Sequence, residues 1–205
     1  AIEAANTQPF CDIHDPGPGV GGHCIPYYPY FVTTQVSRTT PLLQTARYVN
    51  DSMPAYTVER LAEELRATRT RLADATVLVL GITYRPGVAE TRATPAGPII
   101  DALRDREADV VAADPMLRDE EIAAFGATPA TVERLAEYRP DAVVLVTPHD
   151  AFDGIDWADL GELVLVDGRD AVDAESTDHR VYTIGRGTDL AEMASNAARE
   201  PMRGG

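Results

Sequence analysis

Residues 16–24 read PGPGVGGHC, so that a cysteine, Cys24, ends a segment with four glycines and two prolines. Glycine allows positive φ angles and close approach of the main chain to a ligand, while proline fixes φ and lacks an N–H donor. The segment therefore favours an open loop over a helix or a strand. A cysteine thiolate is a strong nucleophile, and free backbone N–H groups beside it can stabilise an oxyanion. This pattern favours thiohemiacetal or thioester chemistry at Cys24.

Three other interpretations of this cysteine remain open. A lone cysteine is most often a small buried hydrophobic residue. Cys11 and Cys24 are the two cysteines of the chain and could form a disulfide, which a reducing compartment disfavours. A zinc site could use Cys11, His14, His23 and Cys24, but adjacent ligands at positions 23 and 24 do not easily reach one tetrahedral metal. We therefore expect no metal, and His23 is not automatically the base for its neighbour.

The composition favours an acidic protein without nucleic-acid or membrane partners. The 205 residues include 33 Asp and Glu against 18 basic residues, all of them arginine, for a net charge of −15. Phosphate-backbone binding needs a basic stripe, and a bilayer span needs roughly 20 apolar residues; neither is present. The two cysteines and the start at Ala1, without a targeting signature, predict a trimmed cytoplasmic protein. The high negative charge predicts a salt-loving source, with an ordinary acidic cytosolic protein as the alternative.

A long helix is predicted at residues 41–67, after a loop-rich segment at 1–40 with an aromatic cluster. Pro41 suits the first helical turn, and apolar residues recur at helical spacing. Pro54 should kink this helix. Such a helix must pack on the next domain or on a second copy of the chain.

From residue 75 onward, apolar runs alternate with helical patterns. Buried parallel strands are predicted at 75–83, 108–115, 141–149 and 162–169, and 181–187 could add an edge strand. Helices are predicted from Thr94 onward and at 117–126, 128–140 and 157–160. The pattern predicts an α/β fold: a long central helix followed by a Rossmann-like, doubly wound parallel sheet with right-handed connections. We expect one unit at 1–70 and a second at 71–205.

Three arginines follow predicted strands, at the edge where parallel sheets bind ligands. Arg85, Arg92 and Arg169 are suited to planar recognition of an anion such as a nucleotide diphosphate. The alternative is that they pair with surface carboxylates, which contributes little to stability. The strand at 75–83 is followed by GITYRPG, so the G-x-G-x-x-G fingerprint of dinucleotide binding is absent from this sheet.

Several segments resemble one enzyme family in the expected order. GPGVGGHCIP (17–26) resembles the active-site loop of the nucleotide-sugar 6-dehydrogenases, the UDP-glucose/GDP-mannose dehydrogenase family, in the form of its UDP-N-acetylmannosamine branch. VLVLGITYRPGVAETRATPA (77–96) resembles the start of the family's UDP-binding domain. ADP (113–115), VTPHDAF (146–152), VDGRD (166–170) and YTIGRG (182–187) follow.

The resemblance implies a dimer built on helix 41–67 and a C-terminal UDP-sugar-binding domain. It implies that the family's N-terminal NAD domain is absent from this chain, so that the chain alone is inactive. The family's catalytic Lys and Asn then fall before Ala1. Arg92 resembles an arginine that reaches the bound NAD.

The implied oxidoreductase reaction is a four-electron oxidation of a sugar C6 alcohol to a carboxylate with two NAD, for polysaccharide biosynthesis. Cys24 resembles the nucleophile that captures the aldehyde. UDP-N-acetylmannosamine is the expected substrate, with UDP-glucose as the alternative. Tyr28 stands where the family often has Asp. This difference slightly favours a second hypothesis, a non-catalytic nucleotide-binding or regulatory module; a zinc-stabilised interaction domain is a third.

The resemblance also implies residues that bind the substrate. Gly21 and Gly22 resemble the part of the loop that lies against the sugar. Tyr84 and Arg85 resemble an aromatic–Lys pair that holds the uridine nucleotide, with Arg in place of Lys. Arg169 resembles an arginine that contacts the UDP-sugar.

Overall fold

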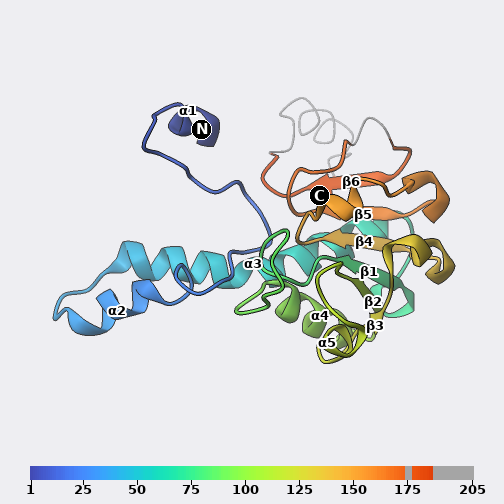
Figure 1. The fold of residues 1–205 in the computed structure, drawn as a ribbon, viewed down its shortest axis with the longest axis horizontal. Helices are drawn as coiled ribbons and strands as arrows, with labels where there is room; N and C mark the ends of the chain where they lie inside the picture. Colours follow the sequence, from blue (N-terminus) through green and yellow to red (C-terminus); the bar gives the residue numbers. More distant parts are fainter. Residues whose placement is uncertain (174–176, 187–205) are drawn as a thin grey trace, which may run out of the picture.

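The computed structural model describes residues 1–173 and 177–186, and Figure 1 shows how its elements are arranged. Gly187, the end of the last predicted strand, and the end of the predicted 71–205 unit lie outside the described residues. Helices come first, and a sheet whose strands alternate with helical segments follows. This order confirms the predicted fold class.

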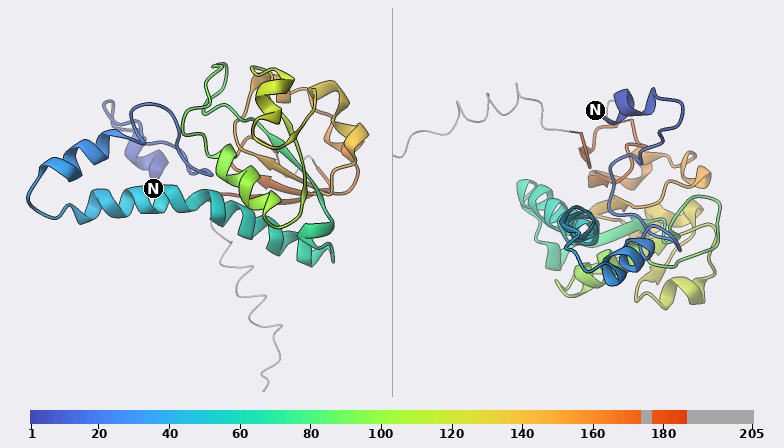
Figure 2. Two further views of the ribbon diagram at one scale, coloured as in Figure 1. Left: turned by 90° about the horizontal axis from the view of Figure 1, so that it is seen from below. Right: turned by 90° about the vertical axis from the view of Figure 1, so that its left-hand side faces the viewer.

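The first part of the chain contains three α-helices: α1 (Ile2–Asn6), α2 (Tyr28–Gln35) and α3 (Pro41–Ala67). The long helix therefore has the predicted bounds, with proline in its first turn, where a missing N–H costs no hydrogen bond. α2 and the N-terminal part of α3 run beside each other and extend away from the sheet (Figures 1 and 2). None of the helices in the described part combines the length and apolar character that a membrane crossing requires.

The sheet has six parallel strands in the order β3-β2-β1-β4-β5-β6, the order of a Rossmann sheet. The strands are β1 (Thr76–Leu80), β2 (Asp109–Ala113), β3 (Thr128–Pro129), β4 (Ala142–Leu145), β5 (Val164–Asp167) and β6 (Arg180–Thr183). The strand order reverses between β1 and β4, which places a crevice at their carboxyl ends.

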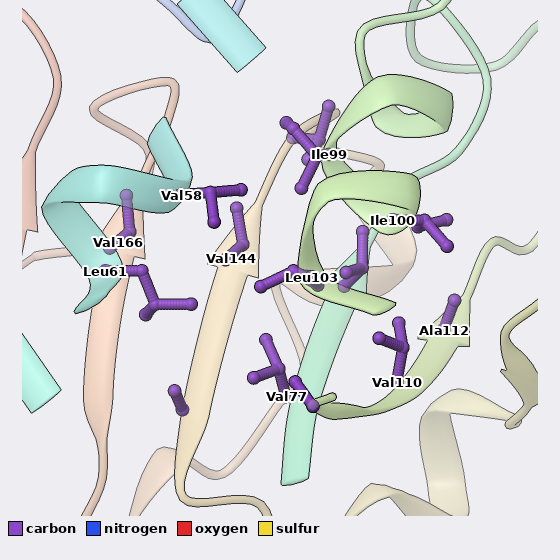
Figure 3. Packing of buried hydrophobic residues seen from close by; sticks show 14 of the residues in the cluster. Val58, Leu61, Val77, Ile99, Ile100, Leu103, Val110, Ala112, Val144 and Val166 are labelled. Carbon is purple, nitrogen blue, oxygen red and sulfur yellow. The ribbon is translucent and has the colours of Figure 1, made fainter. Parts of the chain in front are cut away.

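Each face of the sheet carries its own apolar core, because successive strand residues point to opposite faces. On one face, side chains of α3 and α4 (Ala96–Arg104) pack on the strands; Figure 3 shows Leu61 and Leu103 against Val77 and Val144. α5 (Asp119–Ala123) adds Ile122 to this core.

Three 3₁₀ helices cover the opposite face: η2 (Val132–Tyr138), η3 (Asp150–Phe152) and η4 (Trp157–Leu160). A further 3₁₀ turn, η1 (Leu72–Asp74), connects α3 to β1. The division at residue 70 stays a prediction, since the C-terminal half of α3 is itself part of the sheet's core.

The predicted helix at 128–140 is wrong in its first half. Thr128 and Pro129 form the edge strand β3, and only the residues from Val132 onward are helical, as a 3₁₀ helix. The Ala130 N–H donates to the Ala112 carbonyl at 2.9 Å, so this segment completes hydrogen bonds that β2 would otherwise leave open. An edge strand tolerates proline because one side of it needs no N–H.

The strand predicted at 75–83 ends at Leu80, because the chain turns at Gly81 with a φ of +85°. A Cβ on Gly81 would lie 2.3 Å from the Thr147 carbonyl oxygen, so only glycine allows this approach. The residues from Ile82 onward are thereby released from the sheet to form a loop at its carboxyl edge.

Candidate active site and nucleotide cavity

A cavity of about 580 Å³ lies at the carboxyl edge of the sheet, where the strand order reverses. Loops that follow β1, β4 and β5 form its floor, and the glycine-rich N-terminal segment closes its side. The lining residues are His14, Gly19, Val20, Gly21, Gly22, His23, Cys24, Ile25, Tyr84, Arg85, Pro86, Thr147, Pro148 and Arg169. Its volume suits a small-molecule ligand.

The glycine-rich loop packs directly on the loop after β1. Gly22 has a φ of +97°, and its N–H donates to the Arg92 carbonyl at 2.8 Å. A Cβ on Gly21 would lie 2.7 Å from the Ala93 carbonyl oxygen and 2.8 Å from Tyr84 Cβ. The absence of side chains therefore lets two segments far apart in sequence form one wall of the cavity.

Two further contacts fix the start of the same loop. The Val20 N–H donates to Asn50 Oδ1 on α3 at 2.9 Å. Arg169 Nη2 donates to the Gly19 carbonyl at 3.1 Å, while its Nε donates to the Val146 carbonyl at 2.8 Å. The loop is thus attached both to the long helix and to the sheet.

Cys24 lines the cavity as an exposed, free thiol, so the buried-hydrophobe and disulfide interpretations are wrong. Its carbonyl accepts hydrogen bonds from the N–H groups of Tyr27 and Tyr28, at 3.1 and 2.8 Å, in the turn that leads into α2. This turn brings the Tyr28 hydroxyl beside the thiol. A hydrogen bond with the Cys24 side chain, reinforced by its charge, raises the pKa of Tyr28.

The zinc interpretation finds no support in the geometry. Within residues 1–173 and 177–186, no group of three or more His, Cys, Asp or Glu side chains is placed to hold a metal ion. His23 instead pairs with Glu90, whose Oε2 lies 3.1 Å from Nε2 of the imidazole.

Glu90 links the two loops of the cavity wall. Besides contacting His23, its Oε1 accepts the Arg92 N–H at 3.0 Å, and its carbonyl accepts the Tyr84 N–H at 3.0 Å. The hydrogen bond from His23 and then the one from the Arg92 backbone lower the pKa of Glu90.

Two of the three predicted arginines face the cavity. Arg85 and Arg169 line it, and neither forms an ion pair with a carboxylate in the described part of the chain. Burial lowers the pKa of Arg169, while the negative charge of Asp15 opposes this effect. Arg92 is exposed and is not among the lining residues; its carbonyl, rather than its side chain, contacts the glycine loop.

A buried carboxylate behind the cavity is a feature that the sequence interpretation left without a role. Asp114 follows β2, and its Oδ2 accepts the N–H groups of Ile82 and Thr83 at 2.7 and 2.8 Å and the Thr83 hydroxyl at 2.9 Å. Burial acts to raise the pKa of Asp114, but hydrogen bonds from His149 and from three backbone N–H groups outweigh it and lower the pKa to about 2. The signal in the sequence that could have found Asp114 is its position at the end of a predicted strand, at the edge of the sheet where ligands bind.

The loop after β1 does not fit a dinucleotide. Gly81 is followed by Ile82, Thr83 and Tyr84, so the second and third glycines of the fingerprint are missing, and Thr83 is fully buried. The described residues therefore do not form the turn on which NAD is usually bound.

Two family models match most of the chain. The UDP-binding domain of the UDP-glucose/GDP-mannose dehydrogenase family matches residues 78–174, and the central domain of the same family matches residues 1–52. The chain belongs to the UDP-glucose/GDP-mannose dehydrogenase family. This membership in an oxidoreductase family confirms the resemblance found in the sequence motifs.

Relatives within this family have several named substrates. The chain is 33% identical over 191 residues to a UDP-N-acetyl-D-mannosamine dehydrogenase of Pyrococcus horikoshii. The aligned region covers 91% of this chain and 44% of the relative. A solved structure of the Pyrococcus horikoshii UDP-D-ManNAc dehydrogenase matches with a TM-score of 0.79 over 91% of this chain and 43% of that one. An NDP-N-acetyl-D-galactosaminuronic acid dehydrogenase of Methanosarcina mazei matches at 25% identity and a TM-score of 0.72, over 85% and 40%. The chain spans less than half the length of these relatives.

Proposed function

We propose that this chain is the nucleotide-binding and nucleophile-bearing part of an NAD-dependent UDP-sugar 6-dehydrogenase that converts UDP-N-acetylmannosamine to its uronate. One observation carries the proposal: a single cavity combines the free thiol of Cys24 with Arg85 and Arg169, neither of which forms an ion pair with a carboxylate among the described residues. In a protein of net charge −15, two such arginines favour an anionic ligand.

The cavity's residues suit the parts of a UDP-sugar. Arg85 and Arg169 would hold the diphosphate, and the Tyr84 ring would pack against the nucleoside. The main chain at Gly21 and Gly22 has no side chain to keep the sugar away, so the hexose would lie against it with C6 toward Cys24. A ligand held at both ends presents its reacting carbon in a fixed position.

The chemistry follows from that placement. Sγ of Cys24 adds to the C6 aldehyde, a C–S bond forms, and the carbonyl oxygen takes up a proton to give a thiohemiacetal. Removal of hydride from that carbon, with loss of the hydroxyl proton to solvent, gives a thioester, and water then releases the carboxylate and returns the thiol. NAD would accept the hydride in both oxidations, that of the C6 alcohol to the aldehyde and that of the thiohemiacetal to the thioester. The loop after β1 lacks the glycines of a dinucleotide turn, and we propose that another part of a longer protein binds most of NAD, with Arg92 reaching it.

The sugar assignment rests on the relatives. The relatives described above are named for N-acetylated amino sugars or their uronates, which favours such a sugar over glucose. A non-catalytic nucleotide-binding module is the alternative that Tyr28 beside Cys24 favours, because the tyrosine hydroxyl replaces the carboxylate expected there.

The wider setting is part of the same proposal. We propose a homodimer through α2 and α3, where Phe31, Leu42 and Tyr48 are 61%, 82% and 75% exposed. We further propose a cytoplasmic enzyme of a salt-loving cell that supplies polysaccharide synthesis. The acidic, lysine-free composition supports the salt-loving setting.

The test is a calorimetric titration with UDP in molar KCl. We expect saturable binding by the wild-type chain and a loss of at least about tenfold in affinity in Arg85→Ala, which removes a charge-assisted contact. Arg134→Ala is the control, because Arg134 pairs with Glu137 on the surface and is not among the residues that line the cavity. Equal affinity of all three proteins, or no binding by the wild type, would contradict the proposal.

A further inference from the structure

Three consecutive residues of the β1 loop, Tyr84, Arg85 and Pro86, line the cavity, yet they belong to no helix or strand. Arg85 and Pro86 are exposed. A loop that must hold a diphosphate loses affinity if its residues are free to move, because binding must then order them. The residues that hold the two ends of this loop, Thr83 and Gly87, therefore matter for ligand binding.

One buried side chain contacts both ends. His149 follows β4, is 3% exposed, and packs edge-on against Phe152 with 5.6 Å between ring centres. Its Nε2 lies 2.8 Å from Thr83 Oγ1, at the start of the loop. Its Nδ1 accepts the Gly87 N–H at 3.4 Å, at the end of the loop.

The partners fix which nitrogen carries the proton. The Gly87 N–H can only donate, so Nδ1 must present its lone pair. Nε2 then carries the hydrogen and points toward Asp114 Oδ2, 3.2 Å away, and Thr83 Oγ1. The Thr83 hydroxyl is left to donate to Asp114.

A fifth contact completes this arrangement. The Thr147 hydroxyl donates to the Thr83 carbonyl at 2.6 Å, and Thr147 is itself buried. The start of the loop is thus held by side chains that follow β2 and β4. The end at Gly87 depends on His149, since the Gly87 N–H has no other hydrogen-bond partner in the described part of the chain.

We propose that His149 is a positioning residue for the nucleotide, holding the loop from Thr83 to Gly87 at both ends in its neutral Nε2–H form. The role in ligand binding rests on the proposed function, whereas the role in ordering the loop does not. His149 is not among the residues that line the cavity, and it acts through Tyr84 and Arg85.

Two substitutions separate the two ends. The amide of His149→Gln can reach the position of Nε2 but offers no acceptor to Gly87, while Oδ1 of His149→Asn can replace Nδ1. Val164→Ala is the matched control: it removes core volume at the opposite, amino edge of the sheet, where Val164 is 1% exposed. The measurements are amide hydrogen exchange at Gly87 without ligand and the dissociation constant of UDP.

We expect Gly87 to exchange about tenfold faster in His149→Gln, as loss of one hydrogen bond implies, and to keep most of its protection in His149→Asn and Val164→Ala. We expect UDP affinity to fall about tenfold in His149→Gln and to be unchanged in Val164→Ala. Unchanged Gly87 exchange in His149→Gln would show that His149 does not order the loop. Faster exchange with unchanged UDP affinity would overturn the role of His149 in nucleotide binding.

A wild-type measurement keeps the test decisive if His149→Gln does not fold. The ¹⁵N shifts of the imidazole should show the Nε2–H tautomer, and the Nδ1–H tautomer would overturn the proposal. If the wild-type chain binds no UDP at all, the proposed function fails, while hydrogen exchange at Gly87 still decides whether His149 orders the loop.

Discussion

At the scale of single residues, the thiol of Cys24 differs from that of Cys11 in its surroundings. Cys24 is exposed and lines the cavity, whereas Cys11 is half-buried and is not among the lining residues. Tyr28 lies beside Cys24, and its interaction with that thiol raises the pKa of the tyrosine hydroxyl. A ligand in the cavity should therefore shield one thiol and leave the other unchanged.

This difference gives a labelling prediction. We expect UDP-N-acetylmannosamine to slow alkylation of Cys24 by iodoacetamide at least about fivefold, because the bound sugar would cover the thiol. Cys11 in the same sample is the internal control and should react at an unchanged rate. Peptide mass spectrometry measures both sites, and equal protection of both thiols would contradict a ligand in this cavity.

The buried carboxylate of Asp114 gives a second prediction at this scale. Its pKa falls from 3.8 to about 2 on folding, so its contribution to stability is complete above about pH 4 and is lost as the pH falls toward 2. We expect Asp114→Asn to lower the free energy of unfolding by about 3 kcal/mol at pH 7, because it breaks a buried, charge-assisted network.

Urea unfolding at pH 7, 4 and 2.5 checks the direction in which the contribution of Asp114 to stability changes with pH. The stability difference between wild type and Asp114→Asn should shrink between pH 4 and 2.5, because the carboxyl of the unfolded wild-type chain takes up a proton in this range while the native carboxylate stays largely ionised. Glu120→Gln, which changes an exposed carboxyl on α5, is the control and should have little effect at any pH. A difference that stays constant over this range would show that folding does not lower the pKa of Asp114.

At the scale of elements, the cavity depends on the contact between the glycine loop and the loop after β1. The two segments approach so closely at Gly21 that any side chain there would meet Tyr84 and the Ala93 carbonyl. The N–H of Gly22 donates to the carbonyl of Arg92, the residue before Ala93. Changes in either loop should therefore reach the other.

We expect Gly21→Ala to destabilise the protein by about 1–3 kcal/mol through overpacking, and to weaken UDP-sugar binding at least about tenfold. Gly154→Ala is the matched control, because a Cβ there would meet no atom within 4 Å. Thermal unfolding and calorimetry measure the two effects. Tight binding by Gly21→Ala would show that the loop can separate from Tyr84 without changing the cavity.

At the scale of the whole molecule, two regions have different surfaces. The C-terminal half of α3 is buried against the sheet, while α2 and the N-terminal half of α3 extend from it (Figure 2). The projecting part exposes large apolar side chains. Exposed apolar side chains grouped on one projection indicate a surface that another chain covers. The proposed dimer would bury them.

We expect the chain to sediment as a dimer in molar KCl, and Leu42→Asp to shift it to monomer by placing a charge in the apolar interface. Leu42 is 82% exposed, so the same substitution should leave the fold of the monomer intact. Sedimentation velocity and circular dichroism test the two statements. Arg71→Asp, an exposed change outside α2 and α3, is the control. A monomeric wild type would overturn the proposed interface.

The sequence by itself determined the helix at 41–67, the parallel strands and the loop that ends at Cys24, because each depends on a local pattern. Apolar periodicity, a proline in a first turn and a cluster of glycines can all be read within a few neighbouring residues. The tertiary structure decided that Thr128 and Pro129 form a strand, since pairing with β2 is a contact between distant segments. It also decided that Arg85 and Arg169 face the cavity while Arg92 does not. The same holds for the contacts of His149 with Thr83 and Gly87, because the partner of a buried polar side chain is set by which strand ends the fold brings together.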